Sequence, residues 1–363
     1  MKININKIHF HFLLNVIIVI GITPLVTVLL PVFNCEAYLI EAINSILQQT
    51  FTDFELLIIE GGSKDRSIEI IEQFNDPRIK LIQQEENTKG LAAALNQGLK
   101  LAKGKYIARM DCDDISYNER LAKQVKFMED NPTIGISGTW FEIIGVKNKK
   151  ILRYPIKHEE IKTMLFFMTP LAHPTVIIRK SKLKEYSLEY DPNFIIGEDY
   201  DLWSRCSFYF KLANLPEILL KYRKHPDSLY MKHRDKNKNL FYPIYKRHFE
   251  HLGISIERED YTIIRAIITL DLTNINVDMD FFKKANYWLH LIFESNNQKH
   301  VYLESLFSEK IAEKWFWICY KCKKLGYQVY RTYKNSKLRN FSKIQLLLRM
   351  KFWVLSFLFN INK

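Results

Sequence analysis

Short apolar segments alternate with segments of helical periodicity through the first third of the chain, and this alternation restricts the fold more than any other feature. The apolar segments cover residues 25–30, 56–59, 79–82 and 106–110. Between the last two, Leu91, Leu95 and Leu99 recur at the spacing of one helix face. Strands that alternate with helices of about 10–15 residues form βαβ units, whose parallel strands are buried on both faces. The sequence therefore predicts an α/β fold with a mostly parallel sheet.

The second half of this sheet is predicted to be mixed, because residues 134–137, 139–144 and 175–179 are rich in strand-forming side chains without the regular helical spacers. Residues beyond 231 instead carry leucine, isoleucine and phenylalanine at helical spacing. We therefore expect a helical C-terminal region behind the sheet.

Three carboxylates, Asp111, Asp113 and Asp114, directly follow the fourth apolar segment. Ligands of parallel sheets bind at the carboxyl ends of the strands, so these side chains should share a crevice with Asn34 and Glu60, which follow the first two strands. Neighbouring carboxylates repel one another and are costly to desolvate, and a hard cation such as Mg²⁺ or Mn²⁺ offsets both effects. The alternative is an acidic turn that caps the next helix.

The turn after the first strand contains neither G-x-G-x-x-G nor G-x-x-x-x-G-K-[ST]. The absence of both motifs argues against a dinucleotide-binding Rossmann domain and against a P-loop. A nucleotide site built from carboxylates and a metal remains. A second acidic group, Glu198, Asp199 and Asp201, stands at the start of a helical segment. On charge alone, these carboxylates can be explained without a function, because the helix dipole favours acidic residues in the first turn of a helix.

Several motifs in a fixed order carry a family resemblance. They are Pro31-Val32-Phe33-Asn34, the segment from Glu55 to Asp65, Gly90-Leu91-Ala92-Ala93-Ala94-Leu95-Asn96, Asp111-Cys112-Asp113-Asp114, His173-Pro174-Thr175 and Glu198-Asp199-Tyr200-Asp201-Leu202-Trp203. Together they resemble the family 2 glycosyltransferases over residues 23–228. The resemblance implies a Rossmann-like GT-A fold and an inverting transfer of a sugar from a nucleotide diphosphate, UDP by expectation, to an acceptor hydroxyl.

The resemblance also implies roles for individual residues. Asp199 matches the general base, and Asp111 and Asp113 match the metal motif. His225 is expected either to complete the Mn²⁺ or Mg²⁺ site or to donate to the phosphate. The residues expected to bind the nucleotide-sugar donor are Pro31, Phe33, Glu36, Glu60, Asn96 and Asp111. Trp203 is expected in the core behind the base.

Composition divides the chain into three parts. We expect an apolar N-terminal extension over residues 1–22, in which no signal-peptide cleavage site is evident, and a helical, basic and aromatic-rich region over residues 231–363. Residues 23–230 would be the glycosyltransferase domain that the resemblance implies. Residues 1–220 hold 26 Lys and Arg against 27 Asp and Glu, whereas residues 221–363 hold 27 against 13. All of the positive excess therefore lies behind the acidic site.

The last segment, residues 314–363, contains 12 Lys or Arg and no Asp or Glu. Basic helices with Trp and Phe bind membrane interfaces, whereas basic segments with interleaved aromatic residues also bind single-stranded nucleic acid. Because acceptors of glycosyltransferases are often lipid-linked, we expect peripheral membrane contact through 314–363, with Trp353 and Phe357 toward the bilayer, and no nucleic acid.

Five scattered cysteines in a chain of this size indicate a reducing compartment. Together with the family resemblance and the basic tail, this leads us to expect a cytoplasmic enzyme at the inner face of the plasma membrane. It would act on a glycan or lipid-linked acceptor in surface polysaccharide or glycolipid synthesis. The alternative is a catalytically silent binding protein with the GT-A fold, in which the basic tail binds a membrane or nucleic acid.

Overall fold

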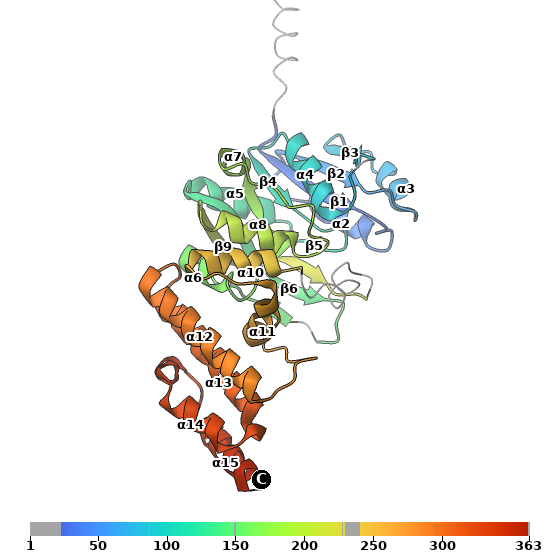
Figure 1. The fold of residues 1–363 in the computed structure, drawn as a ribbon. Coiled ribbons are helices and arrows are strands. Elements are labelled where there is room, and N and C mark those ends of the chain that lie inside the picture. The colour runs from blue at the N-terminus through green and yellow to red at the C-terminus, as the bar shows by residue number, and fades with distance from the viewer. Residues whose placement is uncertain (1–22, 87, 149, 227, 229–239, 362–363) are drawn as a thin grey trace, which may run out of the picture.

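The computed structural model describes residues 23–86, 88–148, 150–226, 228 and 240–361, and the strands of this part form one sheet (Figure 1). The strands are β1 (Val26–Val32), β2 (Phe54–Glu60), β3 (Ile79–Gln83), β4 (Tyr106–Arg109), β5 (Ile115–Ser116), β6 (Ile134–Ile144), β7 (Lys150–Leu152), β8 (Ile177–Arg179) and β9 (Lys211–Arg223). Their order is β3-β2-β1-β4-β8-β6-β9-β5, with β7 paired to β6. Strands β1 to β4 pair in parallel and β8 runs antiparallel to β4. The predicted mixed, mostly parallel α/β sheet is confirmed.

Strand β1 continues past its predicted end, through Pro31 to Val32. The carbonyl of Leu29 faces β4 and that of Val32 faces β2, so the nitrogen of Pro31 points to the β4 side, beyond the last residue pair of those two strands. A proline is tolerated there because no ladder hydrogen bond is lost. The longer strand brings Phe33 to the carboxyl edge of the sheet.

Helices cover both faces of the sheet and connect its strands. They are α2 (Leu39–Leu47), α3 (Ser67–Glu72), α4 (Leu91–Leu101), α5 (Arg120–Asp130), α6 (His158–Met164), α7 (Lys180–Glu185), α8 (Glu198–Cys206) and the 3₁₀ helix η1 (His173–Thr175). The first three alternate with the strands as predicted, and α4 contains the predicted helix face of Leu91, Leu95 and Leu99. Gly98 allows α4 to lie directly on β1, because a Cβ atom at this position would come within 2.2 Å of a methyl group of Leu29.

Strand β9 is the longest element that the sequence did not predict. It runs parallel to β6, and the register of the two strands shifts between Thr139 and Trp140, where their partners on β9 are Leu215 and Ile218. Pro216 follows Leu215 directly and has no pairing partner on β6. Because proline has no N–H to donate to the neighbouring strand, its presence in the sequence suggests a turn at this point. The strand nevertheless continues to Arg223, at the acidic edge of the sheet.

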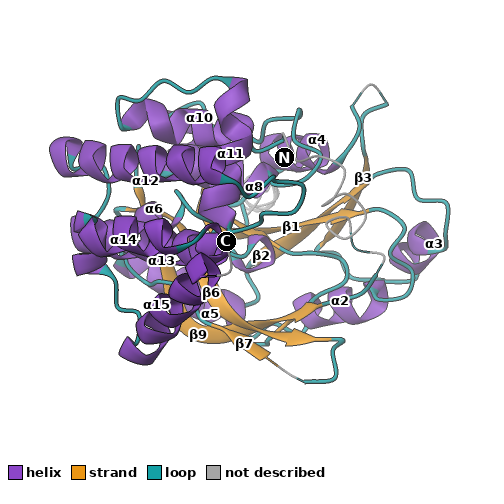
Figure 2. Ribbon diagram, turned by 60° about the horizontal axis from the view of Figure 1, so that its bottom comes forward, coloured by secondary structure: helices purple, strands orange, loops and turns teal. Residues whose placement is uncertain are grey.

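The C-terminal third is helical, as predicted, and its helices gather on one side of the sheet (Figure 2). They are α10 (Tyr242–His251), α11 (Arg258–Thr269), α12 (Met279–Lys299), α13 (Glu304–Lys321), η2 (Cys322–Leu325), α14 (Tyr327–Asn335), η3 (Lys337–Phe341) and α15 (Leu346–Ile361). Ile244 of α10 belongs to the core under the sheet, whereas Tyr245 and Phe249 of α10 share a second core with Phe166, Phe167 and the helices that follow. The expected extension 1–22 and the expected boundary at residue 230 lie outside the described residues.

Among the described helices, none has the length and apolarity needed to cross a bilayer.

Candidate active site

The acidic cluster lies at the carboxyl edge of β4. One ligand atom each from Asp111, Asp113 and Asp114 lies within 4.8 Å of the others. Asp114 is buried, and its Oδ2 has no hydrogen-bond partner among the described residues. Burial, followed by repulsion from Asp111 and Asp113, raises the pKa of Asp114 well above its usual range. The cluster therefore fits an oxygen-ligated divalent cation, because such an ion removes the repulsion and takes the unpaired oxygen.

The end of β9 closes one side of this cluster. The backbone N–H of Arg223 donates to Oδ1 of Asp114 at 2.7 Å, and its Nε donates to the carbonyl of Asp113 at 2.8 Å. Two residues on, Nε2 of His225 lies 2.8 Å from Oδ2 of Asp113. Tyr38 packs against both, with its ring 5.0 Å from the imidazole and 4.6 Å from the guanidinium. The predicted metal residues Asp111, Asp113 and His225 are thus brought together.

A buried arginine links the acidic cluster to the second acidic group. Arg109, the last residue of β4, is 2% exposed and forms an ion pair with Asp111. Burial alone would lower the pKa of Arg109, but the attraction of Asp111 raises it above the usual value, and Glu198 adds to this attraction. The side chain therefore stays charged and places one fixed cation between the two groups of carboxylates.

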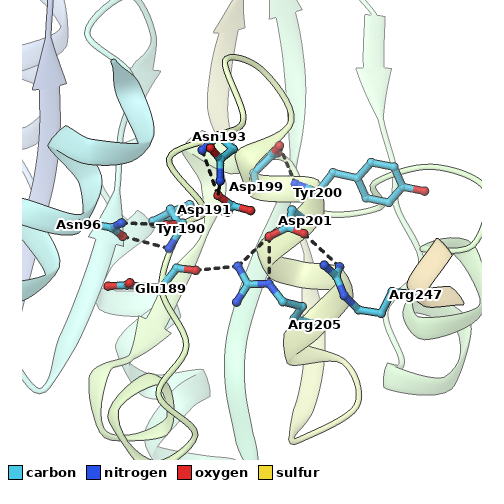
Figure 3. Close-up of polar contacts among 10 residues, drawn as sticks. All are labelled: Asn96, Glu189, Tyr190, Asp191, Asn193, Asp199, Tyr200, Asp201, Arg205 and Arg247. Atoms are coloured by element: carbon cyan, nitrogen blue, oxygen red, sulfur yellow. Dashed lines mark hydrogen bonds and ion pairs between the residues drawn. The ribbon is translucent and has the colours of Figure 1, made fainter. Parts of the chain in front are cut away.

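Helix α8 presents the second acidic group from its first turn. It begins after Gly197, whose φ of 81° is a left-handed conformation that favours glycine. Burial raises the pKa of Glu198 to about 7 and that of Asp199 to about 6, and Glu198 adds repulsion to the latter. Asp199 Oδ1 accepts a hydrogen bond from the N–H of Tyr200 at 2.7 Å (Figure 3). Asp199 is thus a carboxylate that can exchange a proton near neutral pH.

His173 supports this turn as a neutral side chain. Burial lowers the pKa of His173 to about 3. Its Nδ1 lies 3.2 Å from Oε1 of Glu198, and its Nε2 lies 2.9 Å from the hydroxyl of Tyr190. A tautomer with the proton on Nδ1 satisfies both contacts. Trp203 packs edge-on to the imidazole and is fully buried, which confirms its expected place in the core.

Asn96 holds the chain that leads into α8. Its Nδ2 donates to the carbonyl of Tyr190 at 2.7 Å, and its Oδ1 accepts from the N–H of Tyr190 at 2.9 Å (Figure 3). Because Asn96 is buried and both of its amide groups are engaged, any contribution to donor binding passes through the segment that it positions.

The other expected donor residues lie around the loops that follow β1 and β2. The carboxylate of Glu60 is buried and accepts hydrogen bonds from the N–H groups of Gly62 and Ser63, at 2.9 and 2.6 Å. Glu36 accepts from the N–H of Arg66 at 2.9 Å. Pro31 is buried in β1, whereas Phe33 is 61% exposed and offers its ring to a ligand. Glu60 and Glu36 thus shape the loops, and the ring of Phe33 is open to solvent beside them.

Asp201, unlike Asp199, is held in a network of ion pairs. It is fully buried, and it accepts hydrogen bonds from Nε and Nη2 of Arg205 at 2.9 and 2.7 Å and from Nη1 of Arg247 at 3.0 Å (Figure 3). Arg205 also donates to the carbonyl of Glu189 at 2.6 Å. This network joins α8 to α10 and to the segment ahead of α8.

We expect Asp201→Ala to lower the free energy of unfolding by about 3 kcal/mol, because removal of one partner leaves two arginines without their buried counterion. Urea unfolding followed by circular dichroism measures this change. Asp130→Ala is the matched control, since Asp130 pairs with Lys126 at the surface and should cost less than about 0.5 kcal/mol. Equal losses in the two variants would contradict the assigned role.

Arg109 and Arg223 are the site residues that sequence reasoning missed. Arg109 carries a usable signal, because a charged residue inside an otherwise buried strand needs a counterion nearby. Arg223 stands two residues before His225, which the resemblance places at the metal site, and this is the signal that could have found it. The strand that Arg223 ends was not predicted, so its contacts with Asp113 and Asp114 were missed.

Comparison with known proteins adds independent findings. The model of glycosyl transferase family 2 matches residues 27–187. An uncharacterised glycosyltransferase of Haemophilus influenzae is 32% identical over 289 residues, which are 74% of this chain and 86% of that protein. The O-antigen biosynthesis glycosyltransferase WbnJ of Escherichia coli is 35% identical over 221 residues, 57% of this chain and 82% of WbnJ.

Among solved structures, that of S. aureus TarS 1-349 in complex with UDP-GlcNAc has a TM-score of 0.55 at 17% identity and covers 87% of this chain and 89% of its own. At this identity the likeness shows the shared fold. Together with the relatives in sequence, it confirms the resemblance that the ordered motifs carry. The chain therefore belongs to glycosyl transferase family 2 and is a glycosyltransferase by descent.

Proposed function

We propose that this chain transfers a sugar from a UDP-sugar to an acceptor hydroxyl in a single inverting displacement. The observation that supports this best is the environment of Asp199. Burial raises the pKa of Asp199 to about 6, and the charge of Arg109 attracts both this carboxylate and the acidic cluster. A base is most effective when its pKa is near the working pH. Asp199 would accept the proton of the acceptor hydroxyl as the new bond forms.

Asp111, Asp113 and His225 are the residues that would hold Mn²⁺ or Mg²⁺. When bound, the ion would supply Lewis-acid stabilisation of the diphosphate leaving group. The neighbouring protein groups complete the site: Arg109 fixes the carboxylate of Asp111, and Arg223 holds Asp114 in place. These contacts orient the oxygens of the cluster before any ligand arrives.

The donor would lie against the loops after β1 and β2. The exposed ring of Phe33 is suited to stack on a base, and Glu60 holds the facing loop through two N–H groups. The name of WbnJ, an O-antigen biosynthesis enzyme, supports an acceptor in surface glycan synthesis. We place the reaction at the cytoplasmic face of the membrane, on a glycan or lipid-linked acceptor, with no part for nucleic acid.

Donor hydrolysis is the direct test, because it needs no acceptor. The full chain is incubated with Mn²⁺ and, in separate reactions, with UDP-glucose, UDP-galactose, UDP-N-acetylglucosamine and GDP-mannose, and release of nucleoside diphosphate is measured. We expect release from one or two UDP-sugars, and its loss when EDTA removes the metal. The anomeric configuration of the first sugar formed, read by NMR, tests inversion.

Binding of a nucleotide without turnover of any donor would favour the silent binding protein instead. Release from GDP-mannose alone would keep the reaction and overturn the assignment of UDP.

A further inference from the structure

We propose that the outer face of helix α15 docks on a membrane surface rich in anionic lipids. This surface is independent of the catalytic residues, and it is much smaller than the basic segment 314–363 as a whole. Trp315, Phe316 and Tyr333 of that segment are buried in the helical core, so they are not available to a bilayer. Helix α15 lies at the end of the molecule far from the parallel strands (Figure 1).

One side of α15 packs on the protein. Phe352 is fully buried and touches the rings of Phe316, Tyr320, Tyr330 and Tyr333. Ser356, one turn later, is also buried. These contacts fix which side of the helix remains outside.

The other side of α15 is an exposed apolar face. Its members are between 44% and 77% exposed: Leu346, Leu347, Met350, Trp353, Val354, Phe357 and Leu358. At about 100° per residue they fall in one arc of about 140°, on the side opposite Phe352. An exposed apolar face of this size on one helix marks a surface that another apolar phase covers.

Unpaired cations stand beside this apolar face. Lys351 adjoins the arc, and Lys323 lies over the ring of Tyr320, 4.5 Å from its centre, while that ring contacts Phe352 on the packed side of α15. Burial, with added repulsion from Lys324, Lys321 and Lys351, lowers the pKa of Lys323. None of the four forms an ion pair with a carboxylate of the described residues, and residues 314–363 contain no Asp or Glu. The cluster therefore has no compensating carboxylate among the described residues and can take an anionic partner from outside the chain.

An anionic bilayer offers a partner both for the apolar face and for the lysines beside it. Acyl chains cover leucine, methionine and valine, and lipid phosphates meet the lysines at the depth where Trp353 prefers to lie. Nucleic acid offers phosphate but nothing for five aliphatic side chains. A second copy would cover the apolar face but would bring the same excess of positive charge. Because the opposite side of α15 is packed on protein, the helix would lie in the plane of the membrane.

Vesicle flotation of the full chain tests the proposal. We use vesicles of phosphatidylcholine alone and vesicles in which one third of the lipid is phosphatidylglycerol. We expect the native chain to bind the anionic vesicles. Binding should be at least about tenfold weaker for Leu347→Asp with Met350→Asp, because two apolar side chains are lost from the acyl region and two carboxylates take their place. Leu347→Ser with Met350→Ser removes the apolar groups without added charge and should also lower binding.

The matched control is Leu101→Asp with Ile151→Asp, which places the same charges on two exposed apolar residues of the sheet domain. It should bind as the native chain does. Lys321→Gln with Lys324→Gln and Lys351→Gln should abolish the preference for phosphatidylglycerol. Donor hydrolysis serves as the folding check for each variant, and it should be unchanged.

Brominated lipids give a readout at one residue. They should quench tryptophan fluorescence of the bound chain, and Trp353→Phe should remove most of the quenching while flotation persists. The proposal is overturned if both face variants float like the native chain. It is also overturned if the native chain does not bind vesicles and the face variants instead dissociate a dimer in ultracentrifugation or lose affinity for single-stranded DNA.

Discussion

Replacing Asp199 by asparagine is expected to lower kcat by about 10²- to 10⁴-fold while nucleotide affinity stays within about twofold of the native value. The amide keeps the size of the side chain and can still accept from the N–H of Tyr200, so the turn of α8 should persist. It cannot take a proton from the acceptor. Donor turnover with acceptor and calorimetric titration with UDP and Mn²⁺ measure the two quantities separately.

The pH profile carries the same assignment. Since the pKa of Asp199 is raised to about 6, its basic form disappears as pH falls through this value. In the native enzyme, log kcat should therefore rise with a slope near one below about pH 6 and level off above it. The residual activity of Asp199→Asn should lack this step.

Stability gives a check that does not depend on turnover. A carboxylate whose folded pKa is above its unfolded value of 3.8 favours the folded state less and less as pH rises between the two values. At pH 8 the native chain carries this cost in full, and Asp199→Asn does not. The variant should therefore be more stable by about 1–3 kcal/mol at pH 8, and this gain should vanish below about pH 4. A variant that is both less stable and unable to bind UDP would contradict the role of base.

The sequence predicted the parallel half of the sheet because each of its features is local. Apolar runs, helical spacing and turns fall within one βαβ unit, and the rule that ligands bind at carboxyl ends then brings Asp111 and Asp113 to the site. The long-range features were less accessible. Strand β9 pairs with β6 across a bulge at Pro216, and a proline in such a run suggests the end of a strand.

The same limit applies to individual side chains. Glu60 and Asn96 are predicted to bind the nucleotide-sugar donor, and Asp201 belongs to the acidic group at the start of α8. The structure shows that all three hold backbone or arginine groups in place. A motif reports that a residue type is required at a position. It does not report whether the side chain faces the ligand or the loop behind it, because that depends on partners distant in the chain. The contacts of Glu60 and Asn96 with the donor remain predictions.

Replacing Asp111 and Asp113 together by alanine is expected to abolish metal-dependent nucleotide binding, which is the second large effect that we expect. Two of the three clustered carboxylates are then gone, and Asp114 alone is buried and held by Arg223. Calorimetry with UDP should show affinity in the presence of Mn²⁺ at least about 10²-fold weaker than in the native chain. His225→Ala, which keeps the carboxylates, should weaken it about tenfold.

Thermal unfolding separates this interpretation from simple misfolding. In the absence of metal, the double variant should still unfold cooperatively but be less stable than the native chain, because buried Arg109 loses its counterion Asp111 and the relief of repulsion on Asp114 offsets this only in part. Added Mn²⁺ should raise the Tm of the native chain and of Asp130→Ala, a control that removes a surface carboxylate, but not that of the double variant. If the double variant still gains stability from Mn²⁺ and binds UDP as the native chain does, the metal lies elsewhere and the acidic cluster is a structural turn.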